Sequence, residues 1–342
     1  MPNTPLVSVI MPVFNAGIFV NTAIKSLLNQ TLEDIEVVLV NDASTDNSLD
    51  IIKSYSKKDS RITVINSKTN IGAGKARNLG LKAVKGKYLT FMDADDYIEP
   101  DVYKNAFLLA DKSGADEVVW GLTEEHYNRF GKHTKSLVIT PKTKVCTSLK
   151  SKMESILRLE AQTIFGYLWN SLYKTEIIVN NNIDFENAFL YEDFFFNLRV
   201  AKKVKTFATL DNNGYHYFKR KNNSITNQFC KNYYDLSCRR IEEMLDFFEA
   251  SGEVNPMTYN ILGERFLRYT LSAICRNFSK QSNMDWTDKK EWFLKSCDAP
   301  LCKKLLLSYH PVSPVYQILK HCLLSKKPFN ALLLGRTISV IK

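Results

Sequence analysis

Short apolar runs alternate with segments of helical periodicity through the first 120 residues, and this alternation constrains the fold most. Strand patterns cover residues 6–11, 35–40, 62–65, 88–92 and 117–120, and Pro12 is expected to end the first. Helical patterns lie between them at residues 19–28, 46–57, 74–84 and 102–112, and Gly86 follows the third as its stop. This order predicts parallel strands joined by right-handed crossovers, an α/β doubly wound, mostly parallel sheet flanked by helices.

The chain is long enough to form two parts with substantial cores. It has 342 residues, of which 45% are hydrophobic. Residues 121–150 are charged and β-branched, which is typical of a hairpin or a flexible excursion. Beyond residue 228 only helical patterns remain, clearest at residues 235–248 and 260–275. We therefore predict a nucleotide-binding and catalytic domain at residues 1–228 and a C-terminal helical region at residues 229–342.

Composition indicates a cytosolic protein with polyanionic partners. A formal charge of +10 favours nucleotide phosphates, nucleic acid or an anionic membrane face, but the basic residues are too dispersed for a nucleic-acid stripe. The seven cysteines include no CxxC pair, so neither a disulfide framework nor a zinc site is predicted. A signal peptide and an apolar run of about 18 residues are both missing. We expect a cytoplasmic protein, at most peripheral on the inner face of the cell membrane.

An acidic cluster, Asp93-Ala94-Asp95-Asp96, directly follows the strand pattern at residues 88–92. Three carboxylates this close repel one another unless a cation neutralises them. Ligands of open α/β sheets bind just outside the carboxyl ends of the strands. The cluster therefore favours a divalent cation that holds substrate phosphates, with oxygen ligands. The alternative is a solvated acidic turn before a helix that starts near Asp101.

The first two strand patterns also end in residues suited to a nucleotide. The first is followed by Pro12-Val13-Phe14-Asn15 and the second by the segment 41–46. Val13 and Phe14 can cover the face of a base, and the Asp42 carboxylate can accept a hydrogen bond from a base N–H. The alternative is that Asp42 and Asp46 are turn and cap residues, which we prefer for Asp46 but not for Asp42.

A glycine-flexed turn at residues 70–74 leads into the third helix and suggests a phosphate cradle. It contains no Walker Gly-Lys-Ser/Thr, and the third glycine of GxGxxG is missing, so a dinucleotide site is not expected. Arg77, on the first turn of this helix, is predicted to reach a base, a ribose or Asp42. A solvated arginine is the less favoured interpretation.

The strand ends and the glycine turn contain four motifs, which occur in the following order. They are Val9-Ile10-Met11-Pro12-Val13-Phe14-Asn15, Asn41-Asp42-Ala43-Ser44-Thr45-Asp46, Gly74-Lys75-Ala76-Arg77-Asn78-Leu79-Gly80 and Met92-Asp93-Ala94-Asp95-Asp96. Together they resemble a bacterial family 2 glycosyltransferase of the GT-A fold. The resemblance covers residues 6–120 and continues more weakly through residues 169–174, 191–193 and 220–226.

The resemblance implies a role for each residue of the donor site. The strand tip Pro12, Val13, Phe14 and Asn15 would hold the uracil of a UDP-sugar together with Asp42, and Arg77 would support that base site. In the segment Asp93-Ala94-Asp95, Asp93 would contact the ribose and Asp95 would ligate Mn²⁺ or Mg²⁺, with Asp93 as the second candidate ligand. The role of Asp96 is left open.

The resemblance also implies that the pair Glu192-Asp193 supplies the catalytic base, most often the aspartate. The apolar run at residues 194–196 favours this, because a water-poor pocket raises the pKa of a carboxylate. One base and direct attack mean inversion, so an α-linked donor would give a β-linked product. Asp193 is also a candidate N-cap of a helix at residues 194–200, and the two roles are compatible.

The resemblance further implies that the segment around Ser224-Ile225-Thr226, preceded by Lys219, Arg220 and Lys221, closes over the diphosphate. His216 is either a late metal ligand or, as we prefer, a packing residue in a strand.

The sequence thus predicts a metal-dependent, inverting hexosyl- or N-acetylhexosaminyltransferase. It would move a sugar from a UDP-sugar to a hydroxyl of a glycan or lipid-linked acceptor, in the synthesis of a bacterial surface polysaccharide. A nucleotide-binding scaffold and a nucleotidyltransferase of similar fold are the alternatives. The latter should carry a Gly-rich, basic loop at the first strand, which residues 12–15 are not.

Two C-terminal segments, residues 301–307 and 323–329, mix lysines with bulky apolar residues. They are compatible with a membrane-surface contact, a homo-oligomer interface, or ordinary amphipathic helices packed on the core, the most frequent case.

Overall fold

The computed structural model describes residues 4–188, 190–220 and 229–341. The chain divides into two compact units, Met1–Asn222 and Asn223–Lys342. We call them the sheet unit and the helical unit. The division lies close to residue 228, where the sequence patterns change, and the functional roles of the two parts stay predictions.

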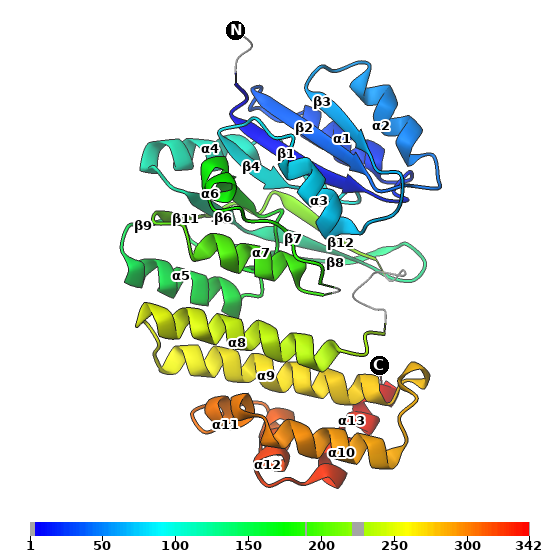
Figure 1. Cartoon of the computed structure of the whole chain (residues 1–342), viewed down its shortest axis with the longest axis vertical. Helices are drawn as coiled ribbons and strands as arrows, with labels where there is room; N and C mark the ends of the chain where they lie inside the picture. Colours follow the sequence, from blue (N-terminus) through cyan, green and yellow to red (C-terminus); the bar gives the residue numbers. More distant parts are fainter. Residues whose placement is uncertain (1–3, 189, 221–228, 342) are drawn as a thin grey trace. The chain divides into compact units, whose positions relative to one another are not determined.

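The sheet unit contains an eight-stranded sheet with the order β3-β2-β1-β4-β10-β6-β11-β9 (Figure 1). Strands β3, β2, β1 and β4 are parallel, whereas β10 is antiparallel to both β4 and β6. The predicted mostly parallel sheet is confirmed, and two strands, β10 and the edge strand β9, run antiparallel to the others. The strands are β1 (Val7–Val13), β2 (Ile35–Asn41), β3 (Ile62–Asn66), β4 (Tyr88–Phe91), β6 (Glu117–Trp120), β9 (Lys144–Cys146), β10 (Ser171–Lys174) and β11 (Phe207–Leu210).

Helices flank this sheet on both sides (Figure 1). Helix α3 approaches β1 closely at Gly80, where an added Cβ would lie 2.4 Å from a methyl carbon of Ile10. Only glycine allows this approach. Arg77 of the same helix contacts Asp93, which directly follows β4. The helices are α1 (Val20–Leu28), α2 (Ser48–Ser56), α3 (Ala73–Leu81), α4 (Val102–Ser113), α5 (Leu149–Ala161), α6 (Thr175–Asn180) and α7 (Glu192–Ala201).

A second sheet, with the order β5-β12-β7-β8, brings distant residues to the acidic cluster. Its strands are β5 (Tyr97–Ile98), β7 (Leu122–Tyr127), β8 (His133–Ile139) and β12 (Tyr215–Lys219). Antiparallel β7 and β8 form the hairpin that was one of two predictions for this region. Strand β12 pairs with β5, directly after the acidic cluster, so residues 215–220 reach the carboxyl end of β4.

Pro12 does not end the first strand, because β1 continues to Val13. Pro12 pairs with Val40 of β2, but β4 pairs with β1 only as far as Ile10. Along β1, the backbone N–H and C=O groups of successive residues point alternately towards β2 and towards β4. Ile10 points towards β4, because its carbonyl accepts from the Met92 amide. The nitrogen of Pro12, two residues later, therefore also faces the β4 side, beyond the last paired residue of β4. A proline is tolerated there because no ladder hydrogen bond is required of its nitrogen.

The third helix ends at Leu81, three residues before the predicted end. The amides of Lys85 and Gly86 donate to the Glu36 carboxylate and the Ser8 hydroxyl, respectively. These buried side chains lie on β1 and β2, and they hold residues 85 and 86 out of the helix. Gly86 is therefore part of a connection to β4.

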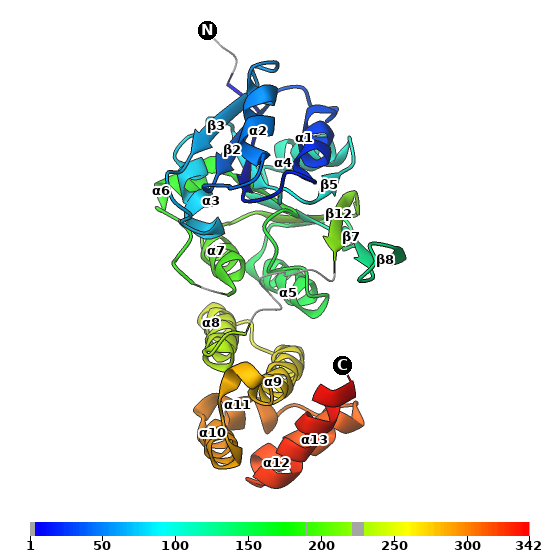
Figure 2. The ribbon, with the colours of Figure 1, turned by 90° about the vertical axis from the view of Figure 1, so that its right-hand side faces the viewer.

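The helical unit consists of helices among its described residues, as predicted (Figure 2). Helix α9 begins with a capping box formed by Asn255 and Thr258. Figure 2 shows α8 and α9 nearly end-on and side by side, with α12 next to α13. The helices are α8 (Tyr233–Ser251), α9 (Pro256–Asn277), α10 (Trp286–Asp298), α11 (Pro300–Leu306), α12 (Pro314–Leu324) and α13 (Pro328–Ile341).

Two further observations concern the whole chain. All seven cysteines lie among the described residues and none forms a disulfide. Across residues 4–188, 190–220 and 229–341, no helix has the length and apolar character required to cross a membrane.

Candidate functional site

Asp42 fastens three segments at the carboxyl ends of β1 and β2. Its amide donates to the Val13 carbonyl, and its buried carboxylate accepts from the amides of Ile71 and Gly72 at 2.7 and 2.9 Å. Gly72 has a φ of 86°, which an L side chain rarely adopts. The glycine turn is therefore bound to Asp42, and each carboxylate oxygen keeps a lone pair for a further donor.

The tip of β1 combines a buried and an exposed apolar residue. Val13 is fully buried, whereas Phe14 is 49% exposed and available to a ligand. The Asn15 side chain accepts from the amide of Thr45 at 2.8 Å, which joins this tip to the loop after β2. Asp46 accepts from the amides of Gly17 and Ser48, in keeping with the turn and cap role preferred for it.

The three carboxylates of the acidic cluster have three different surroundings. Asp93 pairs with Arg77 at 3.0 Å, and Asp95 pairs with Arg220 at 3.1 Å. Half of the Asp95 side chain is exposed. Partial burial and the neighbouring Asp93 raise the pKa of Asp95 above its ordinary value. Asp95 is thus the most open of the three.

Asp96 is buried and anchors β12. Its carboxylate accepts from the Tyr215 hydroxyl at 2.8 Å and from the Phe218 amide at 3.0 Å. Burial raises the pKa of Asp96 well above the usual range, and the charges of Asp95 and Asp93 add to the rise. Both oxygens are engaged in holding the two sheets together, so we assign Asp96 a structural role.

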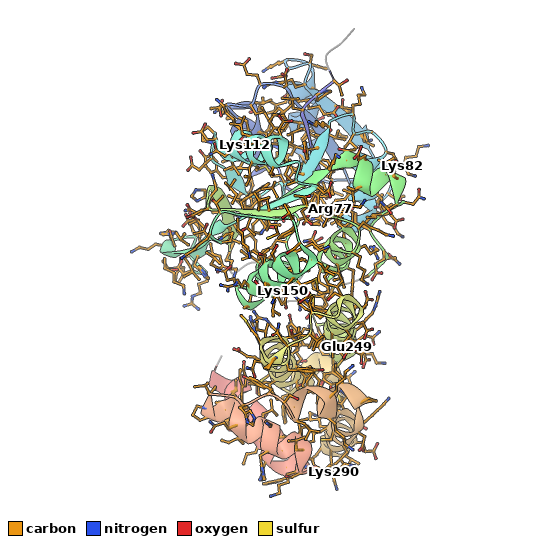
Figure 3. All side chains as sticks on the ribbon, turned by 90° about the vertical axis from the view of Figure 1, so that its left-hand side faces the viewer. Arg77, Lys82, Lys112, Lys150, Glu249 and Lys290 are labelled. Carbon is orange, nitrogen blue, oxygen red and sulfur yellow. The ribbon has the colours of Figure 1, made fainter. Side chains whose placement is uncertain are left out.

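Arg77 joins the acidic cluster to the Glu192-Asp193 pair, and Figure 3 labels it inside the sheet unit. One terminal nitrogen lies 3.0 Å from Asp93, and the other lies 3.0 Å from Asp193 and 3.8 Å from Glu192. Only 6% of the side chain is exposed. Burial opposes the charge, but the three carboxylates outweigh it and raise the pKa of Arg77. Arg77 therefore contacts these carboxylates, while Asp42 is held by backbone amides.

Asp193 lies within the first turn of α7 and is not its N-cap, so the cap interpretation is wrong. The N-cap residue is Tyr191, whose φ of 67° turns the chain into the helix. Glu192 and Asp193 follow it in the first turn, where the helix dipole favours negative charge. Burial raises the pKa of Asp193 to about 7, against the opposing effect of Arg77. The side chain keeps 29% of its surface exposed, so a substrate hydroxyl can reach it.

Glu192 is less directly engaged than its neighbour. Burial also raises its pKa, and Arg77 opposes this. Its carboxylate lies 3.8 Å from the Arg77 guanidinium, against 3.0 Å for Asp193. The geometry therefore favours Asp193 of the two candidate bases.

His216 points at two glutamates. Its ring nitrogens lie 3.0 Å from Glu125 and 3.3 Å from Glu99, and its ring packs on Tyr97. These contacts favour the packing interpretation over a metal ligand. Lys219 pairs with Glu124 at 2.6 Å. Lys221 and the segment Ser224-Ile225-Thr226 lie outside the described residues.

Two aromatic arrangements beside the site were not predicted. Trp169 stacks between Tyr215 and Tyr167, with ring centroids 4.1 and 4.5 Å apart. The Arg220 guanidinium lies 4.1 Å from the ring centroid of Phe19, which holds it beside Asp95. Tyr215 is distant in the chain from Trp169, and Phe19 is distant from Arg220, so local patterns carry no signal for these two contacts.

Asp95 and Asp93 fit a divalent cation that is shared with a diphosphate. Within the described part of the chain, no group of three or more His, Cys, Asp or Glu side chains could hold a metal alone. Two carboxylates supply hard oxygen donors, and Mg²⁺ typically takes its remaining ligands from substrate phosphates and water. The half-exposed Asp95 side chain leaves room for such ligands.

Comparison with known proteins identifies the family. A family model described as Glycosyl transferase family 2 matches residues 8–178, half of the chain. The chain belongs to glycosyl transferase family 2. The predicted enzyme class, a glycosyltransferase, is thereby confirmed.

Bacterial relatives match most of this glycosyltransferase. The Bacillus subtilis proteins EpsJ and EpsH, described as an uncharacterized and a putative glycosyltransferase, are 34% and 32% identical over 65% and 63% of this chain. The matches span only 63% and 61% of those two relatives. A poly(ribitol-phosphate) beta-glucosyltransferase of Bacillus spizizenii is 25% identical over 84% of this chain and 43% of its own length.

The crystal structure of S. aureus TarS 1–349 in complex with UDP-GlcNAc resembles this fold. It superposes with a TM-score of 0.69 at 22% identity, and the match covers 98% of this chain and 92% of that one. The predicted GT-A-like α/β architecture with a C-terminal helical region is confirmed.

Proposed function

We propose that this enzyme is a metal-dependent, inverting glycosyltransferase that transfers a hexosyl or N-acetylhexosaminyl group from a UDP-sugar. The acceptor is a hydroxyl of a glycan or lipid-linked saccharide in bacterial surface polysaccharide synthesis. Two relatives support this: TarS was crystallised with UDP-GlcNAc, and the Bacillus spizizenii relative is named for glucosyl transfer to a polymer. The observation that carries the proposal is the buried Arg77, which pairs with both Asp93 and Asp193.

The donor site lies at the carboxyl ends of β1, β2 and β4. Phe14 would lie against the uracil, and Asp42 would accept from its N–H. Asp93 would contact the ribose, and Asp95, with Asp93, would hold Mn²⁺ or Mg²⁺. When bound, such an ion supplies neutralisation of the negative charge on the departing diphosphate.

Asp193 would act as the base. The acceptor hydroxyl attacks the anomeric carbon, the bond to the UDP oxygen breaks, and the hydroxyl proton passes to the Asp193 carboxylate. A pKa of about 7 leaves this carboxylate largely ionised at slightly alkaline pH and still basic enough to take the proton. Arg77 keeps the carboxylate in place. Direct attack with one base inverts the anomeric configuration.

Screening nucleotide-sugars for metal-dependent hydrolysis tests the donor class. The enzyme should hydrolyse a UDP-sugar slowly in Mn²⁺ without an acceptor, and NMR of the first-formed sugar should show inversion. Preference for a GDP- or CMP-sugar, or turnover unchanged by EDTA, would contradict the proposal.

Residues 229–342 are proposed to provide acceptor, membrane or oligomer contacts. Every donor-site residue named above lies in the sheet unit. A chain truncated after residue 228 should therefore retain donor hydrolysis and lose transfer to acceptor. Full transfer activity by a soluble truncated chain would refute this division of roles.

A further inference from the structure

The end of the helical unit is strongly one-sided in charge. Residues 299–342 contain seven Lys or Arg residues and no Asp or Glu. Helices α11, α12 and α13 lie in this stretch. A protein surface of this composition attracts polyanions, and the leaflet of a bilayer rich in acidic lipids is one of them.

The same stretch exposes large apolar side chains. Val312 is 91% exposed, Leu307 69% and Phe329 63%. Leu333, Ile318 and Leu324 are also exposed. Bulky apolar residues interspersed with lysines and without acidic residues are typical of helices that lie in a membrane interface.

On α13 the apolar and basic residues share the outward face. The inward face packs on α9, where an added Cβ at Gly335 would meet Ile274 and where Ala331 and Leu332 are buried. Phe329, Leu333 and Arg336 recur at helical spacing on the opposite side and are exposed.

Helix α12 lies beside α13 and also packs on α9 (Figure 2). Its inner residues Leu319, Cys322 and Leu323 are buried, whereas Ile318 and Leu324 are exposed. Because both helices pack on α9, their exposed faces both turn away from α9.

Trp286, at the start of α10, extends this surface. Its ring centroid lies 6.0 Å from that of Phe329, and the residue is 43% exposed. Tryptophan is enriched at membrane interfaces because its ring is large and apolar and its N–H remains hydrogen-bonded. Exposed Lys290 follows on the same helix and is labelled in Figure 3.

We propose that Trp286, Ile318, Leu324, Lys327, Phe329, Leu333 and Arg336 form a docking surface for anionic lipid. Phe329, Leu333 and Trp286 enter the headgroup region, and Lys327 and Arg336 face lipid phosphates. A second copy of this chain fits the surface less well, because a two-fold interface would place it against itself and bring like charges together. This surface specifies the membrane contact proposed above for residues 229–342 and rests on that part of the proposed function, but not on the UDP-sugar donor, so the vesicle test and the donor test can fail separately.

Vesicle sedimentation of the full chain tests the proposal. Vesicles of phosphatidylcholine and phosphatidylglycerol in equal parts should bind the enzyme more than about tenfold better than phosphatidylcholine alone. Salt should weaken this binding, because the Debye length falls from about 10 Å at 0.1 M to about 3 Å at 1 M. Equal binding to both vesicles, or binding to neither, would overturn the proposal.

Paired variants locate the surface. The double change Phe329→Ser and Leu333→Ser should lower vesicle partition by about tenfold or more, because it removes two apolar side chains from the interface. The matched control, Leu108→Ser with Val179→Ser, alters two exposed apolar residues of the sheet unit and should bind like the wild type. Circular dichroism establishes that each variant is folded.

A second pair tests the charge. The double change Lys327→Gln and Arg336→Gln should reduce the preference for anionic vesicles, and it leaves the apolar residues intact. This variant therefore tests the proposed surface even if the Phe329 and Leu333 variant does not fold. Unchanged vesicle binding in both pairs would refute the assignment. Light scattering measures the oligomeric state of each variant. If the wild type is a dimer and only the Phe329 and Leu333 variant is not, the surface binds a second copy of the chain instead of lipid.

Discussion

Replacing Arg77 by methionine removes the positive charge that joins Asp93, Asp193 and Glu192. It also shortens the side chain but keeps an unbranched apolar stem. Removing one partner of a buried ion pair typically costs about 3–5 kcal/mol, because the other charge stays buried and unpaired. The Asp93 and Asp193 side chains are 32% and 29% exposed, so solvent screens part of this cost. We expect Arg77→Met to lower the free energy of unfolding by about 2–3 kcal/mol at neutral pH.

Arg61→Met is a matched control in the same unit. Arg61 pairs with Asp59 at 2.9 Å, but 30% of its side chain is exposed, against 6% for Arg77. Its loss should cost less than about 1 kcal/mol, as for most solvent-accessible pairs. The two variants make the same chemical change and differ mainly in burial.

The cost of Arg77→Met should depend on pH with a definite sign. Burial raises the pKa values of Asp193 and Glu192, and Arg77 opposes the rise. Without the guanidinium these two pKa values lie further above their unfolded values, so stability is retained at low pH and lost as pH rises through the folded-state pKa. The loss should therefore be smaller at pH 5 than at pH 7.

Urea denaturation of both variants at the two pH values measures this, with Arg77→Met/Asp193→Asn completing a double-mutant cycle. The double variant should recover part of the lost stability. Equal losses for Arg77→Met and Arg61→Met, or a loss independent of pH, would refute the reasoning.

Two further predictions concern the base and a buried acid. Asp193→Asn should retain UDP-sugar binding in calorimetry but lower the rate of sugar transfer by roughly 10²–10⁴-fold. It should also abolish the rise of kcat/KM through pH 7. If Glu192→Gln alone shows these losses, Glu192 is the base instead. Burial raises the pKa of Glu117 from 4.5 to about 8, so Glu117→Gln should gain up to about 3 kcal/mol of stability at pH 7 and nothing below pH 4.5. Denaturation that shows no gain at pH 7 would contradict the second.

Local patterns predicted the donor side of the site because its residues follow strands directly. Asp42, Asp93 and Asp95 come after the strands β2 and β4, and parallel strands place their carboxyl ends at one edge. Asp193 was recognised only through the resemblance. Its contact with Arg77 spans 116 positions of the chain, and no periodicity encodes such a pairing.

The differences from the predicted fold also have non-local causes. Strand β10 is inserted between β4 and β6, an order that an alternating pattern does not specify. Pro12 stays in its strand because β4 pairs with β1 no further than Ile10. Asp193 has the composition of an N-cap, but the left-handed Tyr191 starts the helix two residues earlier.

Calorimetric titration of UDP into the full chain tests the central proposal most directly. With Mn²⁺ present we expect one site per chain, with binding lost in EDTA. Asp95→Ala should lose the metal-dependent part of the affinity and keep the wild-type circular dichroism, whereas Asp59→Ala, which removes a carboxylate outside the site, should bind normally. UDP binding that is unaffected by EDTA and by Asp95→Ala would contradict a metal-dependent UDP-sugar site at the ends of these strands.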